Sequence, residues 1–567
     1  MRTSVALILA LVLVSSACQS STPPSQSGAP SAAGVRGGRV VGAVGEQPAS
    51  LSPVLGDDFI SQSIWLNFYR PMLNTDPNTG QLVGELAKSF SLSSDLKTIT
   101  FQLRDGLTWS DGQPITGEDY RYTAEAVSRS KKSAFNQNFV DVVGFDDYVA
   151  GKADSIKGIA VAGNTITVTR ANATCVGMRE VGLVDSAIIP QHSFVRDWNN
   201  KTLDATKNID DSKLNDAPPA SSGPFVFTAY HSGVDVTMTR NEKYFRGAPL
   251  LDEYIVKIYS GPQALKAALL TGEVTFATYV PANDVEEIQK TGKDLNYIRV
   301  STPTDNNFIG WNQKSPTAPW LAVKEVRQAL WYGLDVKTAL QKIMLGYATQ
   351  TYTHTAPSFW SYPANGAGLN HYDYNPAKAK QLLEQAGAKM GSDGVYRWTN
   401  GQPMSMKIDG VGGGAPPGLV IEIAQEQYKQ IGIQIVPNLL SFPAFVDHNM
   451  GKAPDRDGTF WGWTPGGPEA EPVYPFYDSK GSQNLWNYSN PAADKAIEAG
   501  RDGPDCSQAA RQKAYTTFNQ ILNDDAANTY LWMRDFIAFS SKSLLGFDPK
   551  PFSLYSDWNA EKWSIKK

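Results

Sequence analysis

The sequence predicts an α/β protein with a strand-rich first half and a second half built on a βαβ unit. Residues 98–104, TITFQLR, alternate polar and apolar side chains, which is typical of a strand with one buried face. Residues 404–409, 419–432 and 433–440 follow one another as strand, helix and strand, and Gly432 ends the helix. This order indicates a parallel sheet in the second half.

The first half alternates strands with turns. Asp-Gly pairs at 105–106 and 111–112 indicate two turns after the strand. Thr116 precedes Asp119 by three residues, a spacing close to a capping box, and it begins a helix that continues to Val127. The remaining elements expected in this half are an opening strand with a turn-rich exit in 37–53, a hairpin in 156–170, a polar domain crossing in 201–222, two strands in 223–245, and a helix and a strand in 262–280.

Helix signals are sharper in the second half. Asn375 can cap a helix whose first position is Pro376 and whose end is marked by Gly387. The remaining elements expected here are a strand in 306–313, one helix in 325–344 that contains Gly333, a helix in 511–525 and a strand in 529–541.

The size and composition of the chain narrow the possible functions. A length of 567 residues favours two to four structural units, and a hydrophobic fraction of 41% is enough for large cores. The formal charge of −5 is small for this length, and Lys131-Lys132 is only a local basic pair. Nucleic acid is therefore not an expected partner.

The N-terminus has the pattern of an export signal. Arg2 precedes an apolar run at 5–14, and small residues at 15–17 lead into Cys18. The run is too short to span a bilayer as a stable helix. The pattern resembles a bacterial lipobox, although Ser15 stands where Leu is usual, so we expect a lipoprotein signal in 1–18 with lipidation of Cys18. Residues 19–38 would form a disordered tether. The alternative is an ordinary cleaved signal.

Cysteine and histidine patterns do not indicate a metal site or an enzyme. Cys175 and Cys506 could form a disulfide in an exported protein, but the sequence does not show that they meet. There is no CxxC motif, no HExxH motif, no GxSxG motif and no phosphate-binding loop. We therefore expect no cofactor, no metal and no catalytic residues.

Two glycine-rich segments are candidates for ligand contact. Residues 410–415, GVGGGA, fit a dinucleotide loop, a plain turn before a helix, or a helix start that donates N–H groups to an anion. No acidic residue follows at the position of a ribose contact, which weakens the first of these. Residues 460–472, FWGWTPGGPEAEP, combine helix-breaking residues with two tryptophans. This segment is either part of a ligand pocket or a structural corner with its tryptophans in the core.

Several blocks, in this order along the chain, resemble the extracytoplasmic solute-binding proteins of oligopeptide, dipeptide and nickel ABC importers. The resemblance covers nearly the whole chain after residue 38, and residues 96–120 are its most specific part. The blocks are GELAKSF, LKTITFQLRDGLTWSDGQPITGEDYRYT, GPFVF, MTRNEKYFRGAPLLDEYIVKI, ALLTGEV, VRQALWYGLD, NPAKAKQLLEQAG and IGIQIV.

The resemblance implies a two-lobed, periplasmic-binding-protein-like clamp of type II, similar to cluster C, with an extra domain inserted in the first lobe. The ligand would lie between the lobes, which close around it by a hinge. The expected boundaries are lobe I in 39–72, 219–301 and 534–567, the inserted subdomain in 73–218, and lobe II in 302–533.

In peptide binders of this family, a second-lobe Trp is followed by an Asp that pairs with the α-ammonium group of the peptide. Trp463 and Thr464 match the start of this loop, but Gly466 stands where the Asp is expected. Glu469 and Glu471 either replace it or are exposed carboxylates. This difference weakens the peptide interpretation, because some members of the family bind oligosaccharides and tryptophans can stack on sugar rings.

The candidate ligand-binding residues are Glu46, Tyr69, Trp360, Trp461, Trp463, Thr464, Gly466, Glu469, Trp486 and Trp532. Core packing explains any one of the tryptophans taken alone better than ligand contact does, with Trp463 the exception because the family motif places it at the cleft. Glu46 matches a cleft-lining position, or it is a turn residue before Pro48.

The expected function is that of a monomeric, lipid-anchored receptor on the extracytoplasmic face of the membrane, at the cell surface or in the periplasm. It would capture an oligopeptide, or alternatively an oligosaccharide, and deliver it to two permease subunits with their ATPases. Nickel chelates and opines are further ligand classes of the family. An enzyme acting on the same ligand and a surface adhesion or signalling receptor are the alternatives from other classes.

Overall fold

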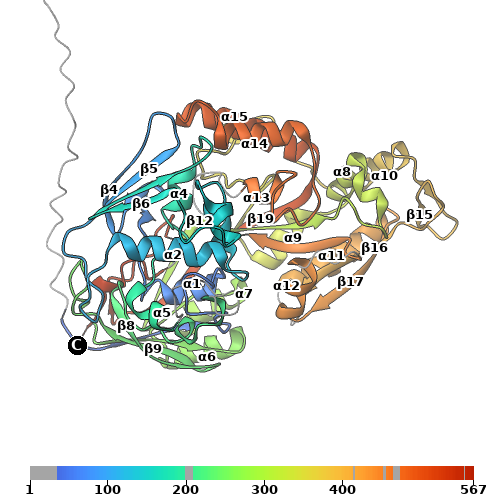
Figure 1. Ribbon diagram of the computed structural model, residues 1–567. Helices are drawn as coiled ribbons and strands as arrows, with labels where there is room; N and C mark the ends of the chain where they lie inside the picture. The colour runs from blue at the N-terminus through green and yellow to red at the C-terminus, as the bar shows by residue number, and fades with distance from the viewer. Residues whose placement is uncertain are drawn as a thin grey trace, which may run out of the picture.

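The computed structural model describes residues 35–197, 209–412, 416–450, 455–463, 473–553 and 556–566. Within these residues, one mixed sheet runs through the molecule (Figure 1). Across the sheet the strands are β17 (Gln434–Leu440), β16 (Ser405–Val411), β18 (Gly458–Trp463), β12 (Leu295–Trp311), β19 (Asn528–Ser541), β11 (Phe276–Thr278), β1 (Arg39–Val44), β10 (Glu253–Ile258), β9 (Asp235–Arg240) and β8 (Phe225–His231), and β13 (Ala348–Gln350) pairs with β19.

A second sheet lies beside the first half of the main sheet. Its strands, in order, are β4 (Ala87–Leu92), β5 (Thr98–Leu103), β7 (Thr165–Thr169) and β6 (Ile159–Ala162). Ile99, Phe101 and Leu103 of β5 are buried, which confirms the predicted alternation. The predicted capping box is also confirmed, since Thr116 and Asp119 cap helix α2 (Gly117–Arg129) reciprocally. The predicted hairpin is β6 and β7.

The predicted βαβ unit is present in the second half. Strands β16 and β17 are parallel neighbours, and helix α11 (Pro416–Gln430) connects them. Helix α10 (Pro376–Gln385) begins after an Asn375 cap, as predicted. The single helix predicted for 325–344 is wrong: Gly333 ends α8 (Lys324–Tyr332), and the Asp335 side chain caps a separate helix, α9 (Val336–Met344).

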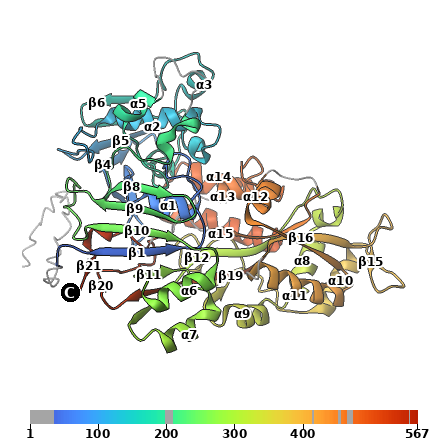
Figure 2. The same ribbon diagram turned by 90° about the horizontal axis from the view of Figure 1, so that it is seen from below.

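Two large hydrophobic cores divide the described residues into two bodies. The first body is built on buried residues within 40–276 and 544–563, together with a smaller core on the opposite face of β1. The second body is built on buried residues within 308–532. The second sheet shares the large core of the first body. Figures 1 and 2 show the second body, with α8, α10 and α11, extending away from β1 and β8–β10.

Strands β12 and β19 contribute to both bodies. Leu295 and Tyr297 of β12 pack in the first body, whereas Phe308 and Ile309 lie in the core of the second. β19 also contributes to both cores: its N-terminal part lies in the second body and its C-terminal part lies in the first, because it is antiparallel to β12. Their pairing shifts register between Val300 and Asp305, so the ladder is interrupted where the two bodies meet.

No described helix has the length and apolarity that crossing a bilayer requires. Among the same residues, no cluster of His, Cys, Asp and Glu is arranged to hold a metal ion.

Trp486 packs against the backbone of β12 and requires a glycine there. A Cβ atom on Gly310 would lie 1.8 Å from Trp486 Nε1, and the Trp486 side chain is buried. Gly310→Ala should therefore lower the free energy of unfolding by about 1–3 kcal/mol or more through overpacking, measured by urea denaturation. Gly45→Ala is the matched control, because nothing lies within 4 Å of its Cβ position. Equal stability of both variants would contradict this packing.

His354 is buried among aromatic rings of the second body. It lies edge-on to Phe476 and Tyr477, and its Nδ1 is hydrogen-bonded to the Tyr477 hydroxyl at 3.3 Å. Burial lowers the pKa of His354 from 6.5 to about 3, because the cationic ring would be desolvated.

The stabilising contribution of neutral His354 is complete above pH 6.5 and is lost as the pH falls toward 3. In that range the unfolded chain binds a proton that the folded protein does not. Relative to His354→Gln, the free energy of unfolding should fall by about 1.4 kcal/mol per pH unit between pH 6 and pH 4. Denaturation at a series of pH values measures the difference, and His231→Gln, at an exposed site, is the control. If the free energy of unfolding depends on pH in the same way for the unmodified protein and for His354→Gln, the result would contradict a buried neutral ring.

Candidate functional site

The register of the main sheet makes strand ends of the two bodies face each other. β18 ends at Trp463, opposite Asn306 of β12, and Asn306 pairs on its other side with Met533 of β19. β11 runs in the opposite direction to β18 and ends at Thr278, opposite Ala538 of β19. Their carboxyl ends therefore point toward one another along the middle of β19.

The parallel neighbours of these two strands share their directions. β1 is parallel to β11, and β16 is parallel to β18. In α/β sheets, ligands bind outside the carboxyl ends of parallel strands. The segment of β19 from Met533 to Ala538, with the strand ends above it, is therefore the candidate site.

An ion pair lies at the centre of this segment. Arg534 Nε donates to Asp305 Oδ1 at 3.1 Å, and Arg534 Nη2 lies 2.5 Å from Asp305 Oδ2. Asn307 Nδ2 also donates to Asp305 Oδ1, at 2.7 Å. The carboxylate of Asp305 raises the pKa of Arg534 above its usual value. This pair holds β12 to β19 directly after the register shift.

Aromatic and acidic residues form the first-body side of the site. Tyr279 follows β11 with a φ of 55°, in the left-handed region that is uncommon for a residue other than glycine. Its ring is edge-on to Phe59 at 4.8 Å and to Phe536 at 5.2 Å. Asp58 caps helix α1 (Phe59–Trp65). Partial burial, together with the charge of Asp58, raises the pKa of Glu46, two residues beyond β1.

A stack of aromatic rings forms the second-body side. Half-buried Trp463 stacks on Phe476 of helix α13 (Val473–Tyr477), with ring centres 4.2 Å apart. It also lies 5.3 Å from Trp461, which stacks on Phe445 of helix α12 (Phe442–Met450). His354 lies behind Phe476, so the stack is supported from the core.

β18 also has a backbone edge at this site. It is paired with β12 along its whole length, but β16 pairs with it only at Gly458 and Thr459. Beyond Thr459, residues 460–463 have no strand partner on the β16 side among the described residues. Their main-chain groups on that side can accept and donate hydrogen bonds.

The structure brings together only some of the predicted site residues. Trp461 and Trp463 lie at the second-body side, and Glu46 lies at the first-body side. Tyr69, Trp486 and Trp532 are inside hydrophobic cores, with exposures of 0%, 2% and 0%, so their rings present no open face. Partly buried Trp360 lies under the guanidinium of Arg511, beside Tyr515.

Five predicted residues lie outside the described part of the chain. These are Thr464, Gly466, Glu469 and Glu471 in the loop after β18, and Cys18 near the N-terminus. Residues 413–415 of the glycine-rich segment are also outside it, and Gly410 and Val411 end β16. Cys175 and Cys506 are joined in a disulfide with an S–S distance of 2.03 Å.

Sequence reasoning missed the centre of the site. The strand predicted to begin at residue 306 starts at Leu295 instead, so Asp305 was placed before a strand rather than inside one. The charged residues Arg534 and Asp535 interrupt the apolar run of β19. This interruption was the sequence signal that could have indicated the centre of the site. Arg534 pairs with Asp305, and Asp535 pairs with Arg299.

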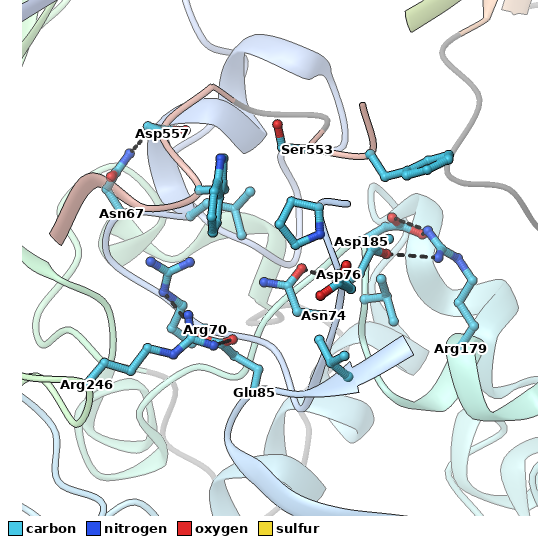
Figure 3. A pocket seen from close by; sticks show the side chains of 17 residues that line it. Asn67, Arg70, Asn74, Asp76, Glu85, Arg179, Asp185, Arg246, Ser553 and Asp557 are labelled. Carbon is cyan, nitrogen blue, oxygen red and sulfur yellow. Dashed lines mark hydrogen bonds and ion pairs between the residues drawn. The ribbon is translucent and has the colours of Figure 1, made fainter. Parts of the chain in front are cut away.

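A cavity of about 240 Å³ lies elsewhere, within the first body (Figure 3). Its walls come from the segment after α1, from β2 (Leu73–Thr75) and β3 (Leu82–Gly84), and from Phe552, Ser553, Asp557 and Trp558. Figure 3 shows Arg70 and Arg246 next to Glu85, and Arg179 next to Asp185.

Several polar groups around this cavity contact one another. Asn67 donates to Asp557 at 2.5 Å, and burial raises the pKa of Asp557 to about 6. Each of its three guanidinium groups faces a carboxylate, with Arg70 and Arg246 sharing Glu85, and Asp76 and Asp557 add two further carboxyl groups to the lining. None of the predicted site residues lines this cavity.

Comparisons with known proteins agree with this architecture. A family model described as "Bacterial extracellular solute-binding proteins, family 5 Middle" matches residues 81–484. The oligopeptide-binding protein AppA of Bacillus subtilis is 25% identical and aligns with 100% of this chain and 98% of its own length.

Solved structures show the same fold. The structure of AppA from Bacillus subtilis in complex with a nonapeptide has a TM-score of 0.80 at 23% identity and covers 94% of this chain and 100% of its own. NikZ from Campylobacter jejuni in complex with Ni(L-His) has a TM-score of 0.77 at 21% identity and covers 93% and 99%.

The α/β fold and the family resemblance predicted from the sequence are both confirmed by these matches. The function of this family is solute binding, not catalysis. The matched residues make up more than half of the chain, and the protein belongs to the family 5 bacterial extracellular solute-binding proteins, the substrate-binding subunits of ABC importers.

Proposed function

We propose that this protein captures oligopeptides between its two bodies and delivers them to the permease of an ABC importer. The observation that carries the proposal is the edge of β18 at residues 460–463, which has no strand partner on the β16 side in the described part of the chain, beside half-buried Trp463. An extended peptide can add to such an edge through its main chain, while side-chain pockets and ring faces select the residues. The full-length similarity to an oligopeptide-binding protein supports the same ligand class.

The acidic groups on the opposite side suit a cationic end of the ligand. Glu46, Asp57 and Asp58 lie close together, and burial together with the charge of Asp58 raises the pKa of both Glu46 and Asp57. An α-ammonium group or a basic side chain placed there would relieve this repulsion and lower both pKa values. These carboxylates could thus take the place of the aspartate that is missing at Gly466.

The two bodies are proposed to act as the lobes of a clamp that bends at β12 and β19. The predicted lobe boundaries at residues 302 and 533 fall within these two strands, near the register shift. Bending there moves the strand ends of one body toward those of the other without disturbing either core. The ligand would be enclosed when the two sides of the site approach.

We also propose that the protein is a monomer, anchored outside the cell by a lipid on Cys18 with residues 19–38 as a tether. It would engage two permease subunits with their ATPases. Mass spectrometry of the membrane-associated protein separates this arrangement from an ordinary cleaved signal, because a diacylglyceryl group adds a defined mass to the N-terminal peptide.

Ligand class can be tested by thermal denaturation with pools of peptides and of oligosaccharides. A peptide present at about 100 times its Kd should add about 2.7 kcal/mol to the free energy of unfolding, which raises Tm by a few degrees. We expect this shift with peptides only. A shift with oligosaccharides alone would replace the proposal by its alternative, and no shift with either pool would contradict both.

Trp463 is expected to contribute directly to binding. Trp463→Ala should raise the Kd of the peptide found in that screen by about tenfold or more, measured by calorimetry, because an aromatic anchor is removed. Trp398→Ala is the matched control, since Trp398 is also half-buried in the second body and packs against the same core. If both variants lose similar stability and neither loses affinity, Trp463 is a packing residue only.

A further inference from the structure

The two bodies are joined at a second place, away from the sheet. Cys175 lies in the first body, two residues before helix α4 (Gly177–Val181), whose Val181 belongs to the large first core. Cys506 lies in the second body, between α14 (Pro491–Asp502) and α15 (Gln508–Asp524). Both of these helices contribute to the second core. The disulfide therefore links one body to the other across 331 residues of sequence.

Polar contacts surround the bond. The Cys175 N–H donates to the carbonyl oxygen of Arg501 at 2.8 Å, and the Thr174 hydroxyl donates to the same oxygen at 3.3 Å. Arg501 Nη2 lies 3.3 Å from Glu180 Oε1, and Arg170 Nη1 lies 2.6 Å from Glu180 Oε2. We call residues 174–180 together with 501–506 the seam.

The seam is separate from the strands on which the clamp is proposed to bend. Figures 1 and 2 both draw α14 to one side of β12 and β19. A smaller apolar contact between the bodies, Phe359 against Phe552, is part of a cluster that contains Met533 of β19 and so lies near the bend. The seam is thus an attachment at a distance from the strand crossing.

We propose that the Cys175–Cys506 disulfide limits how far the clamp opens. The inference rests on the proposed clamp. Two rigid bodies that are attached at two separated places can rotate relative to each other only about an axis close to the line that joins the two attachments. Here the attachments are the strands β12 and β19 and the disulfide. Because the disulfide removes the widest arrangements from the open state, it lowers the entropy of that state and favours closure.

The non-covalent contacts of the seam could not impose this limit. The side chains of Arg501 and Glu180 are 20% and 22% exposed, so water can hydrate both groups when the pair separates. Such a pair, and the hydrogen bonds beside it, would separate during opening and re-form on closure. The covalent bond does not separate, so the residues on either side of it stay together in every state of the clamp.

The double variant Cys175→Ser/Cys506→Ser of the mature protein tests the proposal. Without ligand, its radius of gyration in X-ray scattering should exceed that of the disulfide-bonded protein, whereas the peptide-bound forms should agree. The dissociation rate of the peptide should increase by about threefold or more, because the open state becomes more accessible. A melting curve verifies that the variant is folded.

Arg501→Ala is the matched control, since it removes the ion pair of the seam and keeps the covalent bond. Its radius of gyration and dissociation rate should match those of the unmodified protein. If the double variant does not fold, the folded protein treated with a dithiol provides the same comparison, because the protein disulfide becomes two thiols and the dithiol becomes its own disulfide.

Equal scattering with and without the bond would overturn the proposal and leave the disulfide as a stabilising cross-link. The scattering comparison needs no ligand, so it is independent of the ligand class. If no peptide binds but the radius of gyration still increases, the proposed function fails while the limit on opening stands.

Discussion

The pairing of β12 with β19 is the interaction on which the rest of the structure depends. Each strand packs into the core of one body at one end and into the core of the other at its opposite end. Where the bodies meet, the register shifts and the ladder is interrupted, and the Asp305–Arg534 ion pair holds the strands together directly afterwards. One sheet can therefore continue through both bodies and still have an interrupted ladder of hydrogen bonds between them.

The candidate site is a consequence of that continuity. β11 and β18 belong to different bodies and run in opposite directions, so their carboxyl ends meet above the middle of β19. Neither body alone contains the site: one supplies the acidic residues near Glu46 and the rings around Tyr279, and the other supplies the stack of Trp463 on Phe476. A site divided in this way changes shape whenever the bodies move, as a binding protein requires.

Much of the local structure was predictable from short sequence signals. Asn375 with Pro376, and Thr116 with Asp119, begin helices where expected, because a cap depends on neighbouring residues only. The break between α8 and α9 was missed, since a glycine inside a helical pattern does not by itself show whether the helix continues. The start of β12 was missed because residues 295–305 are largely polar and only the long partner strand makes them a strand.

The sequence by itself determined the fold class, the family and most of the individual helices and strands, because these follow from periodicity, caps and motifs that are local in the chain. Apart from the family motif that places Trp463 at the cleft, it did not separate the tryptophans of the core from those of the site. Only packing decides that Trp463 is half-buried at a strand end while Trp486 lies under Gly310. Cys175 and Cys506 are 331 residues apart, so their meeting depends on how two separately cored bodies are placed, which no local signal encodes.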